Sequence, residues 1–292
     1  MQKKLVTIGL LQESRNKSIE QNLEETIHEI KESAQKGAQI ICLQELFRSK
    51  YFCQSENFNE FKLSETIPGP TTNVLSNIAK ELEVVIISPL FEKRTEGIYH
   101  NSAVVIDADG SIVGSYRKMH IPDDPYFYEK FYFTPGDKGF KSFPTRYGRV
   151  GILICWDQWF PEAARLVALS GAQFVFYPTA IGFHDSDSLE LNRQIAAWET
   201  IQKSHAIANG IFLASVNRVG KEDNLTFWGR SFVCDPFGEI IAQAGANMSE
   251  NLVVECDLLK IEQTRQAWPF LRDRRVDAYQ KLAQIYHDPT NS

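Results

Sequence analysis

The sequence lacks long hydrophobic runs. None of its apolar stretches approaches the roughly 18 residues that a membrane-spanning helix needs. The start, MQKKLVTIGLLQES, is interrupted by Gln12, Glu13 and Ser14 before a secretory apolar segment of normal length can form. These absences predict a cytoplasmic protein that makes no contact with a membrane.

Paired cysteines and blocks of like charge are missing as well. The five cysteines are an odd number, widely spaced and without a C-x-x-C pair, so they are not a disulfide framework. The 31 basic and 37 acidic side chains give a net charge of −6 without any basic block. This balance argues against a nucleic-acid partner.

Motifs of several common enzyme classes are also absent. Histidine patterns such as H-x-H or H-E-x-x-H do not occur, which disfavours a metal-dependent amidohydrolase. The G-x-S-x-G motif of serine hydrolases and the G-x-x-x-x-G-K-[ST] loop of nucleotide-binding enzymes do not occur either.

The residues that are present have an ordinary balance for a folded protein, with 43% hydrophobic and 23% charged residues. Apolar runs of strand length alternate with segments of helical periodicity, which is the pattern of an α/β protein. Strands are predicted at 5–11, 38–43, 84–87, 102–107, 111–118, 149–155, 172–177, 211–217, 228–234, 239–243 and 252–256. Helices are predicted between Ser18 and Gly37 and at 71–82, 161–170 and 189–209.

No linker rich in Gly, Ser or Pro divides the chain, which predicts a single domain over 1–292. Its core would span about 5–257, and the C-terminal extension at about 258–292 could reach a subunit interface. The stretch 119–148 is rich in proline, aromatics and charge and has no period. Long loops of this kind inside compact domains are usually functional.

One short pattern occurs twice. Lys36-Gly37-Ala38-Gln39-Ile40-Ile41 and Ser170-Gly171-Ala172-Gln173-Phe174-Val175 each join the end of a predicted helix to a buried strand. The pattern favours two halves built from a related α/β unit, although a single match of this length can also arise by chance.

Cys155 ends a predicted strand directly before a predicted helix. A residue at such a junction can project into a crevice where backbone N–H groups bind an oxyanion, so Cys155 is a candidate nucleophile. Free cysteines are often small buried hydrophobes, and this alternative stays open. No pattern ties a histidine to Cys155, whereas Glu45 and Lys118 close two other predicted strands. There Glu45 could take the thiol proton and Lys118 could hold an oxyanion.

Three motifs together give the chain a resemblance to a known family. They are Leu43-Gln44-Glu45-Leu46-Phe47, Tyr116-Arg117-Lys118-Met119-His120 and Ile154-Cys155-Trp156-Asp157. In their order and spacing they resemble the carbon–nitrogen hydrolases of the nitrilase superfamily, and the resemblance extends from residue 5 to about 257. It implies a four-layer α-β-β-α sandwich made of two related halves, a homo-oligomer, and neither a metal nor an organic cofactor.

The resemblance also implies roles for individual residues. Glu45 would be the general base, Cys155 the nucleophile and Lys118 the stabiliser of the tetrahedral intermediate. Glu129 matches a second glutamate that orients the substrate in related carbamoyl hydrolases. The backbone N–H of Trp156 would complete the oxyanion hole.

Within the superfamily, the stretches after Lys118 and Cys155 resemble the branch that hydrolyses N-carbamoylputrescine in polyamine biosynthesis. This implies a small-molecule substrate with a cationic amine tail, read by carboxylates and aromatic rings. The residues expected at this tail are Tyr51, Trp156, Asp157 and Asp185, with Asp187, Glu190 and Trp159 as further candidates. Asp157 could equally cap the helix after it or form local hydrogen bonds.

The chain departs from that branch after Gly182, where Phe183-His184-Asp185-Ser186-Asp187 stands and the relatives carry a glutamate soon after the glycine. The alternatives are a hydrolase of another carbamoyl-amine, a carbamoyl-amino-acid or β-ureido-acid hydrolase, an ω-amidase, and a scaffold without activity. A scaffold should have lost at least one of Glu45, Lys118 and Cys155, and all three are present.

Overall fold

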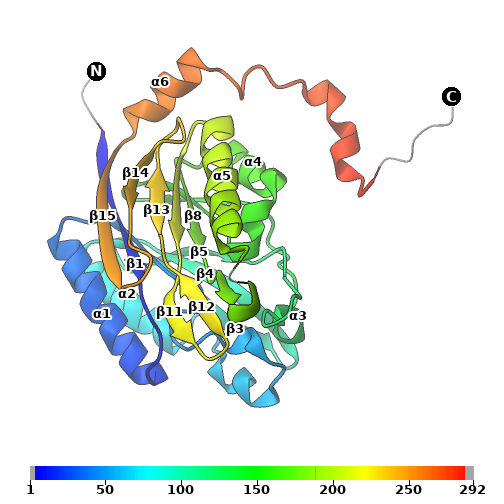
Figure 1. The fold of residues 1–292 in the computed structure, drawn as a ribbon. Coiled ribbons are helices and arrows are strands. Elements are labelled where there is room, and N and C mark those ends of the chain that lie inside the picture. The colour runs from blue at the N-terminus through cyan, green and yellow to red at the C-terminus, as the bar shows by residue number, and fades with distance from the viewer. Residues whose placement is uncertain (1–3, 188, 287–292) are drawn as a thin grey trace.

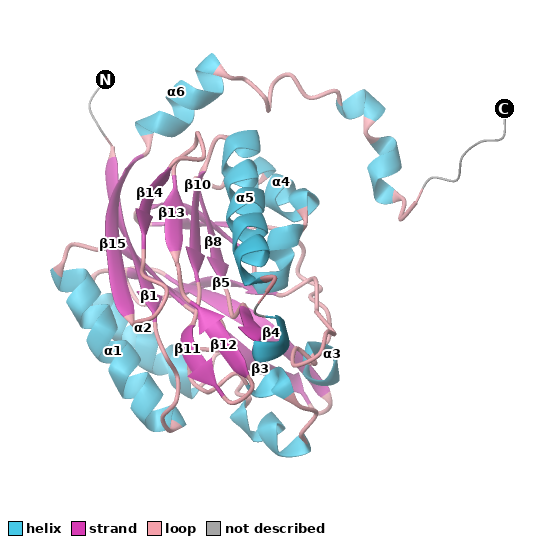
Figure 2. Ribbon diagram, viewed as in Figure 1, coloured by secondary structure: helices cyan, strands magenta, loops and turns pink. Residues whose placement is uncertain are grey.

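The computed structural model describes residues 4–187 and 189–286, without the side chain of Asp187. Two six-stranded sheets lie face to face, and helices cover the outer face of each (Figures 1 and 2). The expected α-β-β-α sandwich is thereby confirmed. Among the helices of the described residues, none combines the length and apolar character that crossing a membrane requires.

The first sheet is built mainly from the N-terminal part of the chain. Its strands, in spatial order, are β15 (Glu250–Asp257), β1 (Leu5–Gln12), β2 (Ile40–Leu43), β3 (Val85–Thr95), β4 (Ile98–Ile106) and β5 (Ile112–Arg117). The pairs β1–β2 and β2–β3 are parallel, whereas β15, β4 and β5 pair antiparallel. Helices α1 (Ile19–Gln35) and α2 (Pro70–Leu82) pack against this sheet.

The second sheet has the same arrangement. Its strands, in spatial order, are β14 (Ile240–Gln243), β13 (Phe232–Cys234), β10 (Phe212–Val216), β8 (Phe174–Pro178), β7 (Gly148–Ile152) and β6 (Ser142–Thr145). Here β7–β8 and β8–β10 are parallel, whereas β6, β13 and β14 pair antiparallel. Helices α4 (Pro161–Leu169) and α5 (Leu191–Asn209) pack against it.

Burial on both faces explains why β2 reads as a continuous apolar run. Ile40 and Cys42 belong to the core between the two sheets. Ile41 and Leu43 point the other way and pack with side chains of α1 and α2. Since successive strand residues alternate between faces, a strand with helices on one side and a sheet on the other needs apolar residues throughout.

The repeated Gly-Ala-Gln pattern marks equivalent places in the two halves. The side-chain Oε1 of Gln39 accepts a hydrogen bond from the Thr7 N–H at 3.0 Å, and Oε1 of Gln173 accepts one from the Arg149 N–H at 2.9 Å. Each glutamine thus ties the start of one parallel strand to the strand beside it. With the matching strand orders, this confirms that the halves are related.

Local signals explain where several helices begin and end. Ser18 caps α1, since its side chain accepts the Gln21 N–H while the Gln21 side chain accepts the Ser18 N–H. Pro70 and Pro161 occupy first-turn positions of α2 and α4, where the missing N–H costs nothing. Gly210 ends α5 in the left-handed conformation, with φ of 58°.

Several boundaries differ from the sequence predictions. The segment 119–148 contains helix α3 (Glu129–Tyr132), strand β6 and the start of β7, so it is only partly a loop. The predicted strand 149–155 ends at Ile152, and Cys155 begins a 3₁₀ helix instead. The 3₁₀ helices are η1 (Phe52–Gln54), η2 (Phe58–Leu63), η3 (Cys155–Trp159), η4 (Asp185–Asp187), η5 (Val276–Ala278) and η6 (Gln280–Ala283).

A third sheet of three short strands was not expected. It consists of β11 (Val219–Glu222), β12 (Leu225–Trp228) and β9 (Gly182–His184). The predicted strand 228–234 is broken between β12 and β13, because Gly229 and Arg230 both adopt positive φ. The strands of this sheet have only three or four residues each, which is too few for a periodic pattern to stand out in the sequence.

Beyond β15 the chain forms helix α6 (Leu259–Ala267) and then runs away from the sandwich (Figure 1). Apolar side chains along this segment are exposed, among them Trp268, Phe270, Val276 and Leu282. The expected subunit contact of the extension stays a prediction, and residues 287–292 lie outside the described part.

Candidate active site

The centre of the site is a buried lysine between two carboxylates. Lys118 directly follows β5 and is fully buried, as is Glu45. The Lys118 Nζ donates to Glu45 Oε1 at 2.8 Å and to Glu129 Oε2 at 2.7 Å. The structure therefore brings together three of the residues that the sequence singled out.

Glu45 lies in the turn after β2. Its Oε1 also accepts a hydrogen bond from Asn101 Nδ2 at 2.7 Å, whereas its Oε2 has no hydrogen-bond partner within the described residues. Asn101, on β4, was missed by the sequence analysis because one asparagine inside a strand gives no signal. One oxygen of Glu45 is thus fixed, and the other is free to exchange a proton.

Glu129 begins α3, the single helical turn inside the 119–148 segment. Its Oε1 accepts a hydrogen bond from the Tyr51 hydroxyl at 2.8 Å. Tyr51, expected at the substrate tail, therefore holds a carboxylate of the central cluster. Both oxygens of Glu129 are occupied as acceptors, which fits its ionised form.

Burial and neighbouring charges shift the ionisation of this cluster. Burial acts to lower the pKa of Lys118, but Glu129 and Glu45 outweigh it, and the pKa is raised well above its usual value. Lys118 therefore stays protonated. Burial raises the pKa of Glu129 to about 7, against the opposing effect of Lys118.

Cys155 occupies the first position of η3, with φ of 43° and 5% of its surface exposed. Burial and the nearby Glu45 carboxylate raise the pKa of its thiol well above the usual value, while Lys118 acts in the opposite sense. A thiol of this kind is neutral at rest and needs a base to become a nucleophile.

Cys155 and Glu129 both line a cavity of about 670 Å³. This volume suits a small molecule. Trp156 and Trp159 line the same cavity, with their rings 6.4 Å apart in an edge-on arrangement. Both tryptophans therefore lie at the cavity, and their contact with a substrate tail stays a prediction.

Asp157 requires a correction. Its carboxylate is fully buried, and it is not among the residues that line the cavity. Oδ2 accepts from the Tyr116 hydroxyl and the Ile154 N–H, both at 2.8 Å, and Oδ1 lies 2.7 Å from His120 Nδ1. With both oxygens engaged inside the protein, Asp157 ties the segment of Cys155 to the segment of Lys118 and does not face the cavity. The local bonding that the sequence left as an alternative is the arrangement found.

The acidic residues after Gly182 are placed less favourably than expected. Asp185 is exposed and pairs with Lys221, and its carboxylate does not line the cavity. Glu190 is exposed and pairs with Arg193. The side chain of Asp187 lies outside the described part of the structure.

Three residues at the cavity were not anticipated. Asp124 lines it, as do Tyr126 and His184, whose rings stack with centroids 4.5 Å apart. The sequence offered a signal for Asp124 and Tyr126, since both belong to the irregular segment 119–148 that was expected to be functional. Nothing in the sequence indicated that His184 faces the 119–148 segment.

A metal centre would need several ligating side chains close together. Within residues 4–187 and 189–286, no group of three or more His, Cys, Asp or Glu side chains is arranged to hold a metal ion.

Comparison with known proteins places this fold and site in a family. Residues 7–266 match the model of the carbon–nitrogen hydrolase family. The chain is 44% identical over 291 residues to the N-carbamoylputrescine amidase of Solanum lycopersicum, covering 97% of this chain and 96% of that protein. It is 38% identical over 290 residues to the citrullinase of Francisella tularensis, covering 96% and 99%.

A solved structure gives the same answer. The crystal structure of a carbon–nitrogen hydrolase from Helicobacter pylori G27 matches with a TM-score of 0.94 at 48% identity, covering 97% of this chain and all of that one. The protein is thus a hydrolytic enzyme by fold and by relatives. It belongs to the carbon–nitrogen hydrolase family of the nitrilase superfamily.

Proposed function

We propose that the protein hydrolyses the carbamoyl C–N bond of a carbamoylated amine with a cationic tail, with N-carbamoylputrescine as the best candidate substrate. The observation that carries this proposal is the Glu45–Lys118–Glu129 cluster beside a cavity that Cys155 lines. The similarity to the amidase of Solanum lycopersicum supports the choice of substrate.

In the proposed reaction, Glu45 accepts the proton of the Cys155 thiol through its free Oε2. The thiolate attacks the carbamoyl carbon, and the ammonium of Lys118 and the backbone N–H of Trp156 stabilise the oxyanion. When the tetrahedral intermediate collapses, the C–N bond breaks and Glu45 gives its proton to the leaving ammonia. The product of this half-reaction is a thiocarbamate ester on Cys155.

In the second half-reaction, Glu45 takes a proton from water, which attacks the same carbon. The C–S bond breaks, the thiol regains its proton, and the carbamic acid that leaves decays to amine and carbon dioxide. The net products from N-carbamoylputrescine would be putrescine, ammonia and carbon dioxide. Glu129 keeps Lys118 in place and orients the substrate.

The cavity favours a cationic tail over an anionic one. Its described lining contains two carboxylates, Asp124 and Glu129, and the aromatic rings of Trp156, Trp159 and Tyr126. It contains no lysine or arginine among the described residues, and Glu129 is already paired with Lys118. Asp124 is therefore our candidate for the group that attracts a substrate ammonium.

The test is ammonia release by purified protein from N-carbamoylputrescine, citrulline, N-carbamoyl-β-alanine and a short aliphatic amide. Citrulline carries an additional carboxylate beside its amine, so its rate relative to N-carbamoylputrescine measures how the cavity treats an anion. We expect N-carbamoylputrescine to have the highest kcat/KM, by about tenfold or more, and Cys155→Ala to abolish turnover.

Asp124→Asn examines the tail separately and should raise KM about three- to tenfold with little change in kcat, because the charge touches only the far end of the substrate. A preference for citrulline or N-carbamoyl-β-alanine would overturn the cationic-tail assignment. Turnover that persists in Cys155→Ala would overturn the mechanism.

A further inference from the structure

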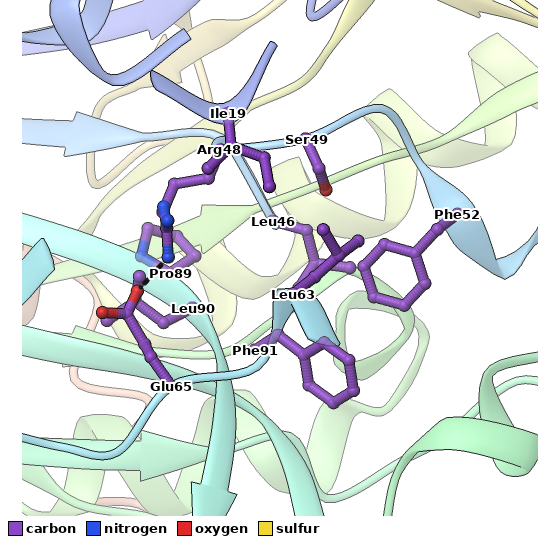
Figure 3. Close-up of a pocket in the computed structure, with 10 residues that line it drawn as sticks. All are labelled: Ile19, Leu46, Arg48, Ser49, Phe52, Leu63, Glu65, Pro89, Leu90 and Phe91. Atoms are coloured by element: carbon purple, nitrogen blue, oxygen red, sulfur yellow. Dashed lines mark hydrogen bonds and ion pairs between the residues drawn. The ribbon is translucent and has the colours of Figure 1, made fainter. Parts of the chain in front are cut away.

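The turn that carries Glu45 has an unusual backbone. Leu46, the next residue, adopts φ of 50°, a left-handed conformation that is costly for a branched side chain. Its side chain lines a small pocket, where it lies with the apolar side chains of Phe52, Leu63 and Phe91 (Figure 3). Apolar packing therefore anchors the turn on its side-chain face, but it leaves the backbone carbonyls of the turn to be satisfied elsewhere.

Arg218 satisfies those carbonyls. It is fully buried, and its Nη2 donates to the carbonyl oxygens of Glu45 at 3.0 Å, Leu46 at 2.6 Å and Ser49 at 3.0 Å. It comes from the connection between β10 and β11, far from Glu45 in the sequence. A single guanidinium group thus holds the turn of the proposed general base.

The charge of Arg218 is balanced by Glu222, which is also fully buried. Nη1 of Arg218 lies 2.9 Å from Glu222 Oε1 and 3.1 Å from Oε2. Oε2 of Glu222 in turn accepts the Tyr51 N–H at 2.7 Å, and the Tyr51 hydroxyl donates to Glu129. The pair therefore reaches both carboxylates around Lys118, Glu45 through the turn and Glu129 through Tyr51.

We propose that the buried Arg218–Glu222 ion pair is a positioning pair that holds Glu45 and Glu129 on either side of Lys118. This inference rests on the proposed function, since it takes Glu45 and Glu129 as working groups. Neither member of the pair lines the cavity, so both act through the segments that they hold.

Geometry explains why arginine is needed. A guanidinium presents several donors in a fixed plane, and here Nη1 serves the carboxylate of Glu222 while Nη2 serves the three carbonyls of the turn. A lysine keeps the charge but cannot satisfy both groups from one position. A shift of about 1 Å in a catalytic carboxylate can cost on the order of 100-fold in rate.

The experiment compares Arg218→Lys with a matched control, Arg15→Lys. Arg15 is also a buried arginine paired with a glutamate, Glu29, but it contacts neither the turn of Glu45 nor Tyr51. With N-carbamoylputrescine, we expect Arg218→Lys to lower kcat about 30-fold or more while KM stays within about threefold. Arg15→Lys should leave kcat within about threefold, even if both variants lose a similar amount of thermal stability.

Glu222→Gln provides a second variant in case Arg218→Lys does not fold. It keeps the shape of the side chain but weakens the hold on Tyr51. The Tyr51 hydroxyl acts to lower the pKa of Glu129, so displacing it should move the acid limb of the kcat/KM profile to higher pH. A purely structural role of the pair would not move this limb.

Alkylation of Cys155 by iodoacetamide, followed by mass spectrometry, gives a readout that needs no substrate. It should be slower in Arg218→Lys than in Arg15→Lys, because a displaced Glu45 accepts the thiol proton less well. Equal kcat, equal alkylation and an unmoved acid limb would overturn the positioning pair. If the wild-type protein turns over none of the substrates, the proposed function fails, while the alkylation rates still decide on the pair.

Discussion

The two halves of the sandwich share one arrangement of strands and differ in the residues at the ends of those strands. Glu45 comes after β2, and Thr179 stands at the equivalent place after β8. Cys155 comes after β7, and Glu13 stands at the equivalent place after β1. The arrangement of strands is therefore repeated while the residues at the strand ends are not, and each half supplies a different one of the proposed reacting groups.

The hairpins of the two halves show the same contrast. In the first half, β3 and β4 form one long hairpin, whose register shifts only near its end, between Lys93 and Thr95. In the second half the corresponding hairpin is broken into β10–β11 and β12–β13, and its outer part joins β9 in the small third sheet. The break contains Arg218, so the departure from the repeat is what lets the second half hold the Glu45 turn of the first.

The largest effect should come from changing a strand-end group in one half. Glu45→Gln should lower kcat about 1,000-fold, because the amide cannot accept the thiol proton. Glu13→Gln, a buried acid at the position equivalent to Cys155, should leave kcat within about threefold. Steady-state ammonia release measures both, and similar losses in the two variants would contradict the functional difference between the halves.

A pH profile should show an intermediate effect from Glu129. Its pKa is raised by burial to about 7, and Lys118 and Tyr51 both donate to its ionised form. We therefore expect kcat/KM to fall about tenfold per pH unit below 7 and to level off above it. Glu129→Gln should remove this limb and lower the plateau about 10- to 100-fold.

Glu129 should also affect stability, and in the opposite direction: kcat/KM rises with pH, whereas the contribution of Glu129 to the free energy of unfolding falls. Because its pKa is raised from 4.5 to about 7 in the folded protein, the native state binds the proton more tightly than the unfolded chain does. Its contribution to the free energy of unfolding is present below pH 4.5 and is lost as the pH rises through about 7. If the fall of kcat/KM below pH 7 persists in Glu129→Gln, another residue is responsible for that fall.

The smallest effect should come from the repeat itself. Gln39→Ala and Gln173→Ala each remove one hydrogen bond between adjacent parallel strands, and each should lower the free energy of unfolding by about 1 kcal/mol. The double variant should show the sum, because the two sites lie in different sheets. Urea unfolding measures all three, and a cost confined to one half would show that the two glutamines are not equivalent.

Much of the fold could be predicted because a strand that is buried on both faces has a recognisable, continuously apolar sequence. The runs that became β1, β2 and β8 were recognisable because strands covered on both sides are apolar throughout. The predicted end of β7 was wrong, because Leu153 and Ile154 continue the apolar run although they do not belong to the strand. A left-handed residue such as Cys155 also has no signal in the side-chain pattern.

Candidate site residues could be recognised in the sequence where they come soon after a strand, and could not where contacts between distant segments decide. Glu45, Lys118 and Cys155 could be singled out by position and resemblance, and the structure places them around one centre. Arg218 and Asn101 could not, because their partners are set by how the sheets pack. The prediction for Asp157 was wrong because the sequence does not show whether a carboxylate two residues after Cys155 points into the cavity or into the protein.

The burial of the cysteines has a consequence for chemical labelling. All five thiols lie within the described residues, and Cys42, Cys53, Cys234 and Cys256 are almost completely enclosed. Only Cys155 among them lines the cavity. An electrophile shaped like a small urea should therefore modify the native protein once per chain, at that sulfur alone. Such a stoichiometric tag would count competent active sites in a preparation without a turnover assay.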